Sequence, residues 1–223
     1  MTPPAAATVP GSGDAPPLLS EHERSVLGVV VYSCTVSSIR HAKDADRAPS
    51  MAERGEMLRM SAERVAALDG LGALAASVGA DAAAAAEPFM GALGDFDQRL
   101  RPLDWAERLL KTHLALGLLA DFCRALAAGL SEPLRSGLSG ALVEDRSARF
   151  AADALVPGID SDPQLAGRLG LWGRRVGGEE IGTLQRMLAS FPPLLDGAAG
   201  LEDVHAVLSE GAVTRMRSLG LRD

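Results

Sequence analysis

Apolar positions recur at three- and four-residue steps along most of the chain after residue 19, which is the period of an amphipathic α-helix. Ser20 and Ser50 each precede a glutamate by three positions, as in a capping box. Asp104 precedes another apolar run, and Asp162-Pro163 is typical of a first helical turn. We therefore predict helices over residues 20–42, 50–78, 104–128, 132–155, 163–189 and 201–218, with a short one between 87 and 98.

No stretch of alternating apolar and polar residues predicts a strand. Hydrophobic residues make up 47% of the sequence but aromatic residues only 4%, and the abundant alanine and leucine favour helix. Four of the expected helices are long enough for a bundle. We expect an all-α fold, with a four-helix bundle and two additional C-terminal helices. Residues 20–223 would form this single domain, after a disordered Pro/Ala-rich tail over residues 1–19.

The net charge of −7 argues against a broad phosphate-binding face, so we do not expect a nucleic-acid partner. Two cysteines and the lack of a secretion signal indicate a reducing compartment, and we expect the protein to be cytoplasmic. No apolar run approaches the roughly 20 residues that span a bilayer, so we expect no membrane association.

Polar side chains share helix faces with apolar ones. On the first helix, Cys34, Ser38 and His41 recur at helical spacing, and on the helix from 104 so do His113 and Cys123. Such faces point to the interior of a bundle, where each buried polar group needs a partner or a ligand. The alternative for any one of these residues is a satisfied polar group in an ordinary core.

Five segments in order resemble a known family: EPFMGALGDF, PLDWAERLLK, DFCRALAAGL, DSDPQLAGRLGLWGRRVGGEE and TLQRM. They are similar to the bacterial ferritin-like proteins grouped with tRNA hydroxylases, which act on methylthio-isopentenyl-adenosine, and the resemblance covers about residues 25–220. It implies a ferritin-like bundle with peripheral helices. Active members hold two irons with a carboxylate from the first helix, Glu-x-x-His from the second, a carboxylate from the third and an acidic-x-x-His from the fourth.

In this chain the ligand positions that the resemblance implies are mostly occupied by other residue types. They fall on Cys34 in the first helix, Arg64 and Ala67 in the second, Leu116 in the third, and Glu144 and Ser147 in the fourth. Only Glu144 keeps a ligand type. One carboxylate beside an arginine does not hold two cations, so we expect no metal and no other cofactor.

A bundle that has lost these ligands would contain an apolar pocket at their position. We expect it to bind an apolar small molecule and to promote a cofactor-independent cyclisation, isomerisation or elimination in specialised metabolism. In this hypothesis Glu144 is the general acid or base, Arg64 sets its charge state and His113 is a second proton carrier. The expected lining residues are Cys34, Ser38, Ala67, Leu116, Cys123 and Ser147.

Two other functions stay open. In one, the pocket has collapsed, and the chain is a catalytically dead homologue that acts as a scaffold or partner subunit. Leu116 favours collapse. Small or polar residues favour a retained cavity, and these are Cys34, Ala67 and Ser147. In the other, the chain is a diiron tRNA hydroxylase, which would need the replaced ligands. Whichever function holds, we expect a homodimer that pairs through an outer face, with Trp172 as a candidate contact.

Overall fold

The computed structural model describes residues 19–143, 145–195 and 200–222, without the side chains of residues 95, 97 and 98. These residues form helices and connecting segments and contain no strand. The α-helices are α1 (Glu21–Arg47), α2 (Met51–Ser77), α3 (Ala82–Ala86), α4 (Gly94–Arg99), α5 (Trp105–Ala127), α6 (Leu134–Gly140), α7 (Asp145–Ser161), α8 (Pro163–Ser190) and α9 (Leu201–Ser218). Two 3-10 turns lie at Glu87–Phe89 and Pro192–Leu195.

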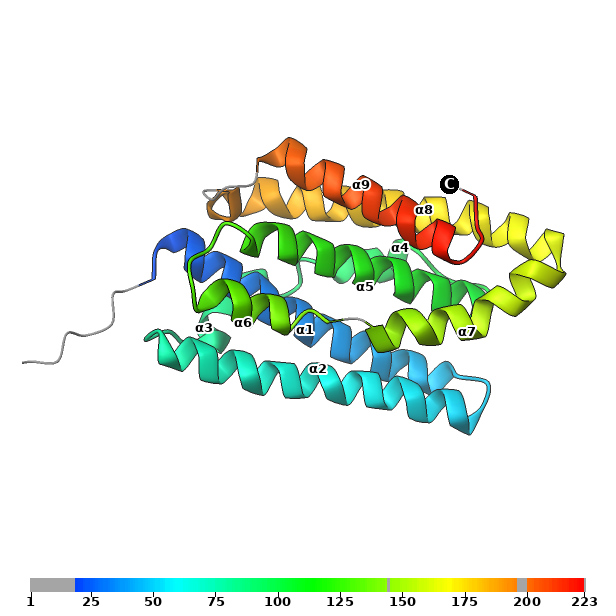
Figure 1. Cartoon of the computed structure of the whole chain (residues 1–223), viewed down its shortest axis with the longest axis horizontal. Coiled ribbons are helices and arrows are strands. Elements are labelled where there is room, and N and C mark those ends of the chain that lie inside the picture. Colours follow the sequence, from blue (N-terminus) through cyan, green and yellow to red (C-terminus); the bar gives the residue numbers. More distant parts are fainter. Residues whose placement is uncertain (1–18, 144, 196–199, 223) are drawn as a thin grey trace, which may run out of the picture.

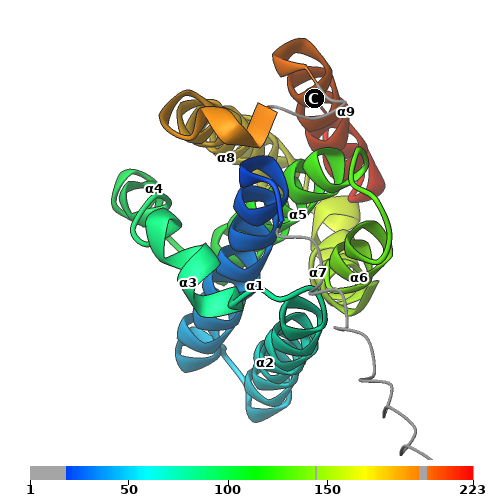
Figure 2. The same cartoon turned by 90° about the vertical axis from the view of Figure 1, so that its left-hand side faces the viewer.

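Helices α1, α2 and α5, together with the pair α6 and α7, run along the long axis of the molecule and form the bundle (Figure 1). Seen from one end, α8 and α9 lie on the side of α5 opposite to α2 (Figure 2). Helix α5 is the central element, since it packs against α1, α7, α8 and α9. The predicted all-α fold, with a four-helix bundle and two additional C-terminal helices, is confirmed.

The predicted starts of α1, α2, α5 and α8 are also confirmed, and at each of these four a side chain caps the first turn. Ser20 accepts a hydrogen bond from the main-chain nitrogen of Glu23, and Ser50 does the same for the helix that follows it. The carboxylates of Asp104 and Asp162 cap α5 and α8 in the same way. These starts are local features, since the capping residue and its partner are at most three positions apart.

The predicted helix over residues 132–155 is wrong in one respect, because it is two helices. Helix α6 ends at Gly140 and α7 begins at Asp145. Gly137 and Gly140, both in the last turn of α6, have low helix propensity and therefore disfavour one uninterrupted helix over residues 132–155. Helix α7 then continues to Ser161, beyond the predicted end.

The prediction between residues 87 and 98 was also wrong in detail. In place of one short helix, the chain forms the 3-10 turn Glu87–Phe89 and then α4. Residues 1–18 of the predicted tail lie outside the described residues. Leu19, the last residue of that tail, is half-buried and packs against the core.

The described core consists of two hydrophobic clusters, and α5 contributes to both. Leu118 and Phe122 belong to the first cluster, and Leu110 and Leu114 to the second. All four are fully buried, which explains why the middle of α5 is almost continuously apolar. The outer face of α2, in contrast, is largely exposed to solvent.

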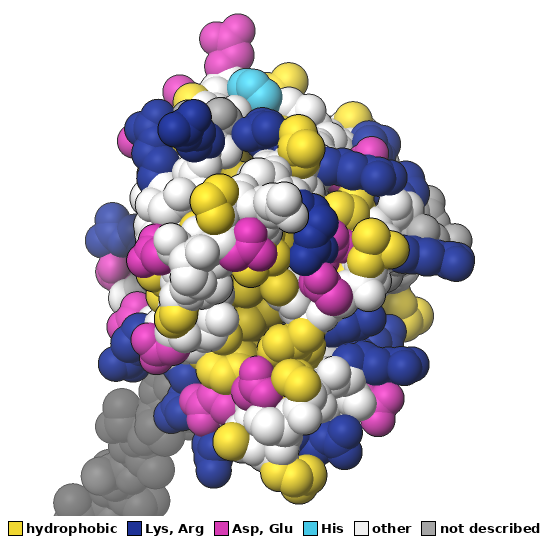
Figure 3. Space-filling model, turned by 90° about the vertical axis from the view of Figure 1, so that its right-hand side faces the viewer, with side chains coloured by type: hydrophobic (Ala, Val, Ile, Leu, Met, Phe, Trp, Pro, Cys, Tyr) yellow, Lys and Arg dark blue, Asp and Glu magenta, His cyan; other side chains and the backbone are white. Residues whose placement is uncertain are grey.

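The surface at the end where α7 meets α8 combines charges of both signs with apolar side chains (Figure 3). Apolar side chains gather in the middle of this face, and Lys, Arg, Asp and Glu side chains surround them. This face is not uniformly basic, in line with the overall net charge of −7.

Candidate functional site

A cavity of about 720 Å³ lies among α1, α2, α5, α6 and the start of α7. Of the six residues at which the sequence resemblance implies metal ligands, four line it: Arg64, Ala67, Leu116 and Ser147. These residues come from three different helices of the bundle, and the fold brings them to one place. Leu116 does not fill the space.

Arg64 points from α2 to the break between α6 and α7. Its guanidinium donates hydrogen bonds to the carbonyl oxygens of Ala141, at 3.1 Å, and of Val143. Main-chain carbonyls left free by a broken helix need donors, and a guanidinium with several N–H groups supplies them. Arg64 therefore binds main chain in the structure. Glu144, its predicted partner, lies outside the described residues, so that ion pair stays a prediction.

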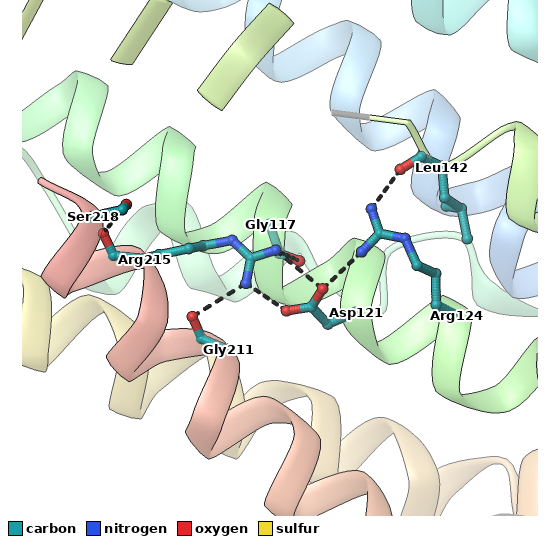
Figure 4. A network of polar contacts seen from close by, with 7 residues as sticks. All are labelled: Gly117, Asp121, Arg124, Leu142, Gly211, Arg215 and Ser218. Atoms are coloured by element: carbon teal, nitrogen blue, oxygen red, sulfur yellow. Dashed lines mark hydrogen bonds and ion pairs between the residues drawn. The ribbon is translucent and has the colours of Figure 1, made fainter. Parts of the chain in front are cut away.

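A second arginine holds the same break from the other side. Arg124 on α5 donates to the Leu142 carbonyl oxygen at 2.7 Å and to Asp121 at 2.7 Å (Figure 4). Asp121 also accepts from Arg215 on α9, whose guanidinium reaches the Gly117 carbonyl oxygen at 2.9 Å. This network joins α9, through α5, to the segment that borders the cavity.

Cys34 lies next to the cavity but does not line it. The side chain is 1% exposed, and its Sγ is 3.8 Å from the Ala141 carbonyl oxygen. Burial raises the pKa of the Cys34 thiol, and the nearby Arg64 charge offsets only part of that rise. Cys34 is therefore a neutral thiol at neutral pH and a poor nucleophile.

Three predicted site residues lie away from this cavity. Ser38 bonds across to Ser61 on α2, with its Oγ 3.1 Å from the Ser61 carbonyl oxygen. Cys123 is fully buried in the first core cluster. His113 lines a second cavity, of about 470 Å³, among α5, α7 and α9. Ser147 lines both cavities, so they adjoin at this residue.

His41 lines the larger cavity and was not among the predicted site residues. It is 4% exposed, and neither ring nitrogen has a hydrogen-bond partner among the described residues. Burial, and then the charge of Arg64, lower the pKa of His41 to about 4, against a small opposing effect of the Ser37 main chain. The ring is neutral at pH 7. Helical spacing placed His41 on the same helix face as Cys34, but no sequence motif identified His41 as a site residue.

His113 is in a similar state in its own cavity. Its Nε2 has no partner among the described residues, and the side chain is 7% exposed. Burial, followed by the charge of Arg215, lowers the pKa of His113 to about 4. A group with this pKa holds little charge at pH 7 and is a weak base there.

The side chains around the larger cavity do not fit a dinuclear metal site. Across the described ranges, no group of three or more His, Cys, Asp or Glu side chains could hold a metal ion. Glu63, the nearest acidic residue on α2 to the expected ligand position, is 2.6 Å from Arg146 in an ion pair. Two cations need several anionic or imidazole donors in one place.

Ion pairs connect the two helices that border the mouth of the cavity. Arg146, in the first turn of α7, pairs with Glu56 at 2.7 Å and with Glu63 at 2.6 Å, both on α2. All three side chains are partly exposed, so each pair contributes little to stability. They nevertheless set the distance between α2 and α7 at this point.

No single helix in the described ranges is long and apolar enough to span a membrane. The bent pair formed by Met51–Ser77 and Ala82–Phe89 meets the criteria of length and composition alone, with a bend of 106°.

Comparison with known proteins agrees with this architecture. Residues 21–195 match the family model described as a ferritin-like domain of actinomycetes. A solved structure of a Synechococcus protein with aldehyde deformylating oxidase activity superposes with a TM-score of 0.68 at 17% identity, covering 91% of this chain and 93% of that one. At this identity the likeness shows the fold alone. No curated protein matches the sequence. The predicted ferritin-like bundle is confirmed.

Proposed function

Since the chain belongs to the actinomycete ferritin-like domain family, we propose that it is a metal-free member whose former diiron position is a pocket for an apolar small molecule. The observation that supports this most is the cavity of about 720 Å³ at that position. Its volume is in the range of pockets that enclose small organic ligands. We also propose that the chain derives from the group of tRNA hydroxylases that its sequence segments resemble.

The pocket offers a ligand apolar surface and also several charged side chains, among them Glu63 and Arg146. Met60, Leu71 and Leu116 provide apolar surface, and Arg64 lies beside them with a positive charge. Such a pocket favours a ligand that is mainly hydrocarbon with one polar or anionic group. The ligand would be oriented by that group.

We propose a cofactor-independent reaction, namely a cyclisation, isomerisation or elimination, in which the pocket holds the substrate in a reactive shape. Glu144 stays the proposed general acid or base. His113 lies in the adjoining cavity, so His41 is better placed beside the ligand. Its low pKa makes His41 a poor base at pH 7, and we assign it the role of a neutral hydrogen-bonding group.

Filling the pocket should weaken ligand binding strongly. We expect Ala67→Trp to weaken the binding of anilinonaphthalene sulfonate, an apolar dye with one anionic group, by about tenfold or more. The indole would occupy space beside Arg64. Fluorescence titration measures the effect. Ala76→Trp is the matched control, because Ala76 is exposed on the same helix and does not line the cavity. Equal binding by wild type and Ala67→Trp, or none by wild type, would contradict the pocket.

Metal loading separates this proposal from a diiron enzyme. We expect purified protein that is incubated with ferrous iron under anaerobic conditions and then desalted to retain well under about 0.5 iron per chain. The reason is the set of residues at the family ligand positions, among them Arg64, Ala67 and Leu116. Elemental analysis gives the ratio. A ratio of about two irons per chain would refute the metal-free proposal and favour the diiron tRNA hydroxylase.

A catalytically dead scaffold or partner subunit is the second candidate. The observation that favours it is the structural use of Arg64, which bonds two main-chain carbonyls at the helix break. The homodimer also stays a proposal. Trp172, the expected contact, is half-buried, and its indole nitrogen donates to the Glu107 carbonyl oxygen at 2.9 Å within the chain.

A further inference from the structure

His41 is a buried polar group at the larger cavity whose hydrogen bonds the fold leaves unmade. The side chain is 4% exposed and lines the cavity from α1, and neither ring nitrogen has a hydrogen-bond partner among the described residues. The Ser37 main chain, one turn earlier, has only a small effect on the pKa of the ring. A buried polar atom without a partner costs free energy. A ligand that places a polar atom beside His41 would recover part of that cost.

Arg64 lies near His41 and has N–H groups left to donate. Its charge is one cause of the lowered pKa of His41, which places the guanidinium close to the ring. The guanidinium has five N–H groups, and two of them bond the main-chain carbonyl oxygens at the break between α6 and α7. Glu63, the neighbouring carboxylate on α2, pairs with Arg146 instead. Arg64 also lines the cavity, so its remaining donors are available to a ligand there.

These two side chains suit an oxygen atom that gains negative charge during a reaction. The neutral ring of His41 carries one N–H, and no hydrogen bond among the described residues fixes which nitrogen holds it, so this N–H can face the cavity. A carboxylate is matched best by charged partners, whereas the ring is neutral at pH 7. Fixed N–H donors beside a single positive charge stabilise a carbonyl oxygen as it becomes negative.

We propose that the substrate of this cavity is an apolar unsaturated ketone or ester, whose carbonyl oxygen accepts hydrogen bonds from His41 and Arg64. The two residues thereby define the substrate class of the pocket proposed above, on which this assignment rests. The cavity walls contributed by Met60, Leu71 and Leu116 contact the hydrocarbon part of the substrate.

The reaction that this arrangement supports is movement of a carbon–carbon double bond through an enolate. The carboxylate base proposed above removes a proton from the carbon between the double bond and the carbonyl group. The C–H electron pair forms a new double bond to the carbonyl carbon, and the C=O π pair moves to the oxygen, where His41 and Arg64 stabilise it. The base then returns the proton to the far carbon of the original double bond. The C=O bond forms again, and the double bond now adjoins it.

A phenol tests the site, because a phenolate oxygen resembles an enolate oxygen. The neutral and ionised forms of para-nitrophenol differ in absorbance, so the pKa of this probe can be measured while it is bound to the full chain. We expect the bound probe to have a pKa lower than that of the free probe by about one unit or more, which is a preference of about tenfold for the phenolate. A pocket without these donors gives the opposite sign, because burial disfavours the charged form.

Variants assign the effect to the two side chains. His41→Leu should reduce the preference for the phenolate by about fivefold or more, and Arg64→Met by about tenfold. Arg64→Met also loses the bonds at the helix break, so His41→Leu decides if that variant does not fold. Met60→Leu is the matched control, because Met60 lines the same cavity and the exchange nearly conserves volume. This control should change the preference by less than about twofold.

The outcomes separate this proposal from the pocket on which it rests. Binding of the probe with an unchanged or raised pKa would overturn the proposal and leave the pocket in place. An equal preference for the phenolate in the wild type and in His41→Leu would also overturn it. Tighter binding of para-nitrobenzoate than of the phenolate would assign the site to carboxylic acids and overturn it. If the wild type binds neither form of the probe, the pocket itself is refuted and the proposal with it.

Discussion

Gly28→Ala is expected to destabilise the protein by about 3 kcal/mol or more, since overpacking against rigid groups costs this much. Gly28 lies where α1 crosses α3, and a Cβ there would be 2.0 Å from the carbonyl oxygen of Ala85. That oxygen belongs to the main chain, so no side-chain rotation relieves the contact, and α3 would have to move away from α1. Urea unfolding followed by circular dichroism measures the loss.

Gly178→Ala is the control for this substitution. Gly178 is exposed in α8, and a Cβ there would have no atom within 4 Å. Alanine in a helix interior should stabilise the protein by about 0.5–1 kcal/mol, since it removes the extra backbone freedom of glycine. If Gly28→Ala unfolds at the same urea concentration as the wild type, the close approach of α1 and α3 is wrong.

Acid should destabilise the protein strongly between pH 6.5 and about 4, through His41 and His113. Both rings are buried, and burial lowers both pKa values to about 4 in the folded state. In the unfolded chain a histidine has a pKa near 6.5, so within this window the unfolded state binds more protons. The contribution of the two neutral rings to the free energy of unfolding is therefore fully present above about pH 6.5. It is lost as pH falls, by about 1.4 kcal/mol per pH unit for each histidine.

Variants separate the effect of the two histidines from the loss of stability that protonation of carboxylates causes in acid. His41→Leu and His113→Leu should each lower the slope of unfolding free energy against pH by about 1.4 kcal/mol per unit in that window. Urea unfolding at a series of pH values measures the slope. His205→Gln, which changes an exposed histidine on α9, is the control and should leave the slope of unfolding free energy against pH nearly unchanged. Slopes for His41→Leu and His113→Leu that equal the wild-type slope would show that the two rings are not buried as neutral groups.

The local features of the chain follow from the sequence by itself. Ser20, Ser50 and Asp104 cap their helices within three positions, so their effect depends on neighbours in the chain. Helical period and the family resemblance put Arg64 and Leu116 on inward-facing positions, and in the structure both line one cavity. A continuous helix fixes the face of each residue, and four long helices leave few ways to combine those faces.

Other features depend on contacts between distant segments. Gly137 and Gly140 weaken the helix before the break after α6, but the break is held by Arg64 and Arg124, which come from two other helices. His113 shares a helix with Leu116 but faces another cavity, because α9 packs against α5 and brings Arg215 beside it.

A cavity of about 350 Å³ lined by Arg40, Lys43, Arg101, Arg108 and Lys111 likewise arises only in the tertiary structure. Its cations are spread over α1, α5 and the link before α5, and none is part of a basic run. Phe96, fully buried, brings Arg40 and Lys111 to one point, although 71 positions separate those two residues in the sequence. The local sequence was enough to locate the long helices α1, α2, α5, α8 and α9, but not the break between α6 and α7. Packing between helices decided which side chains share a cavity, because that depends on distances across the fold rather than along the chain.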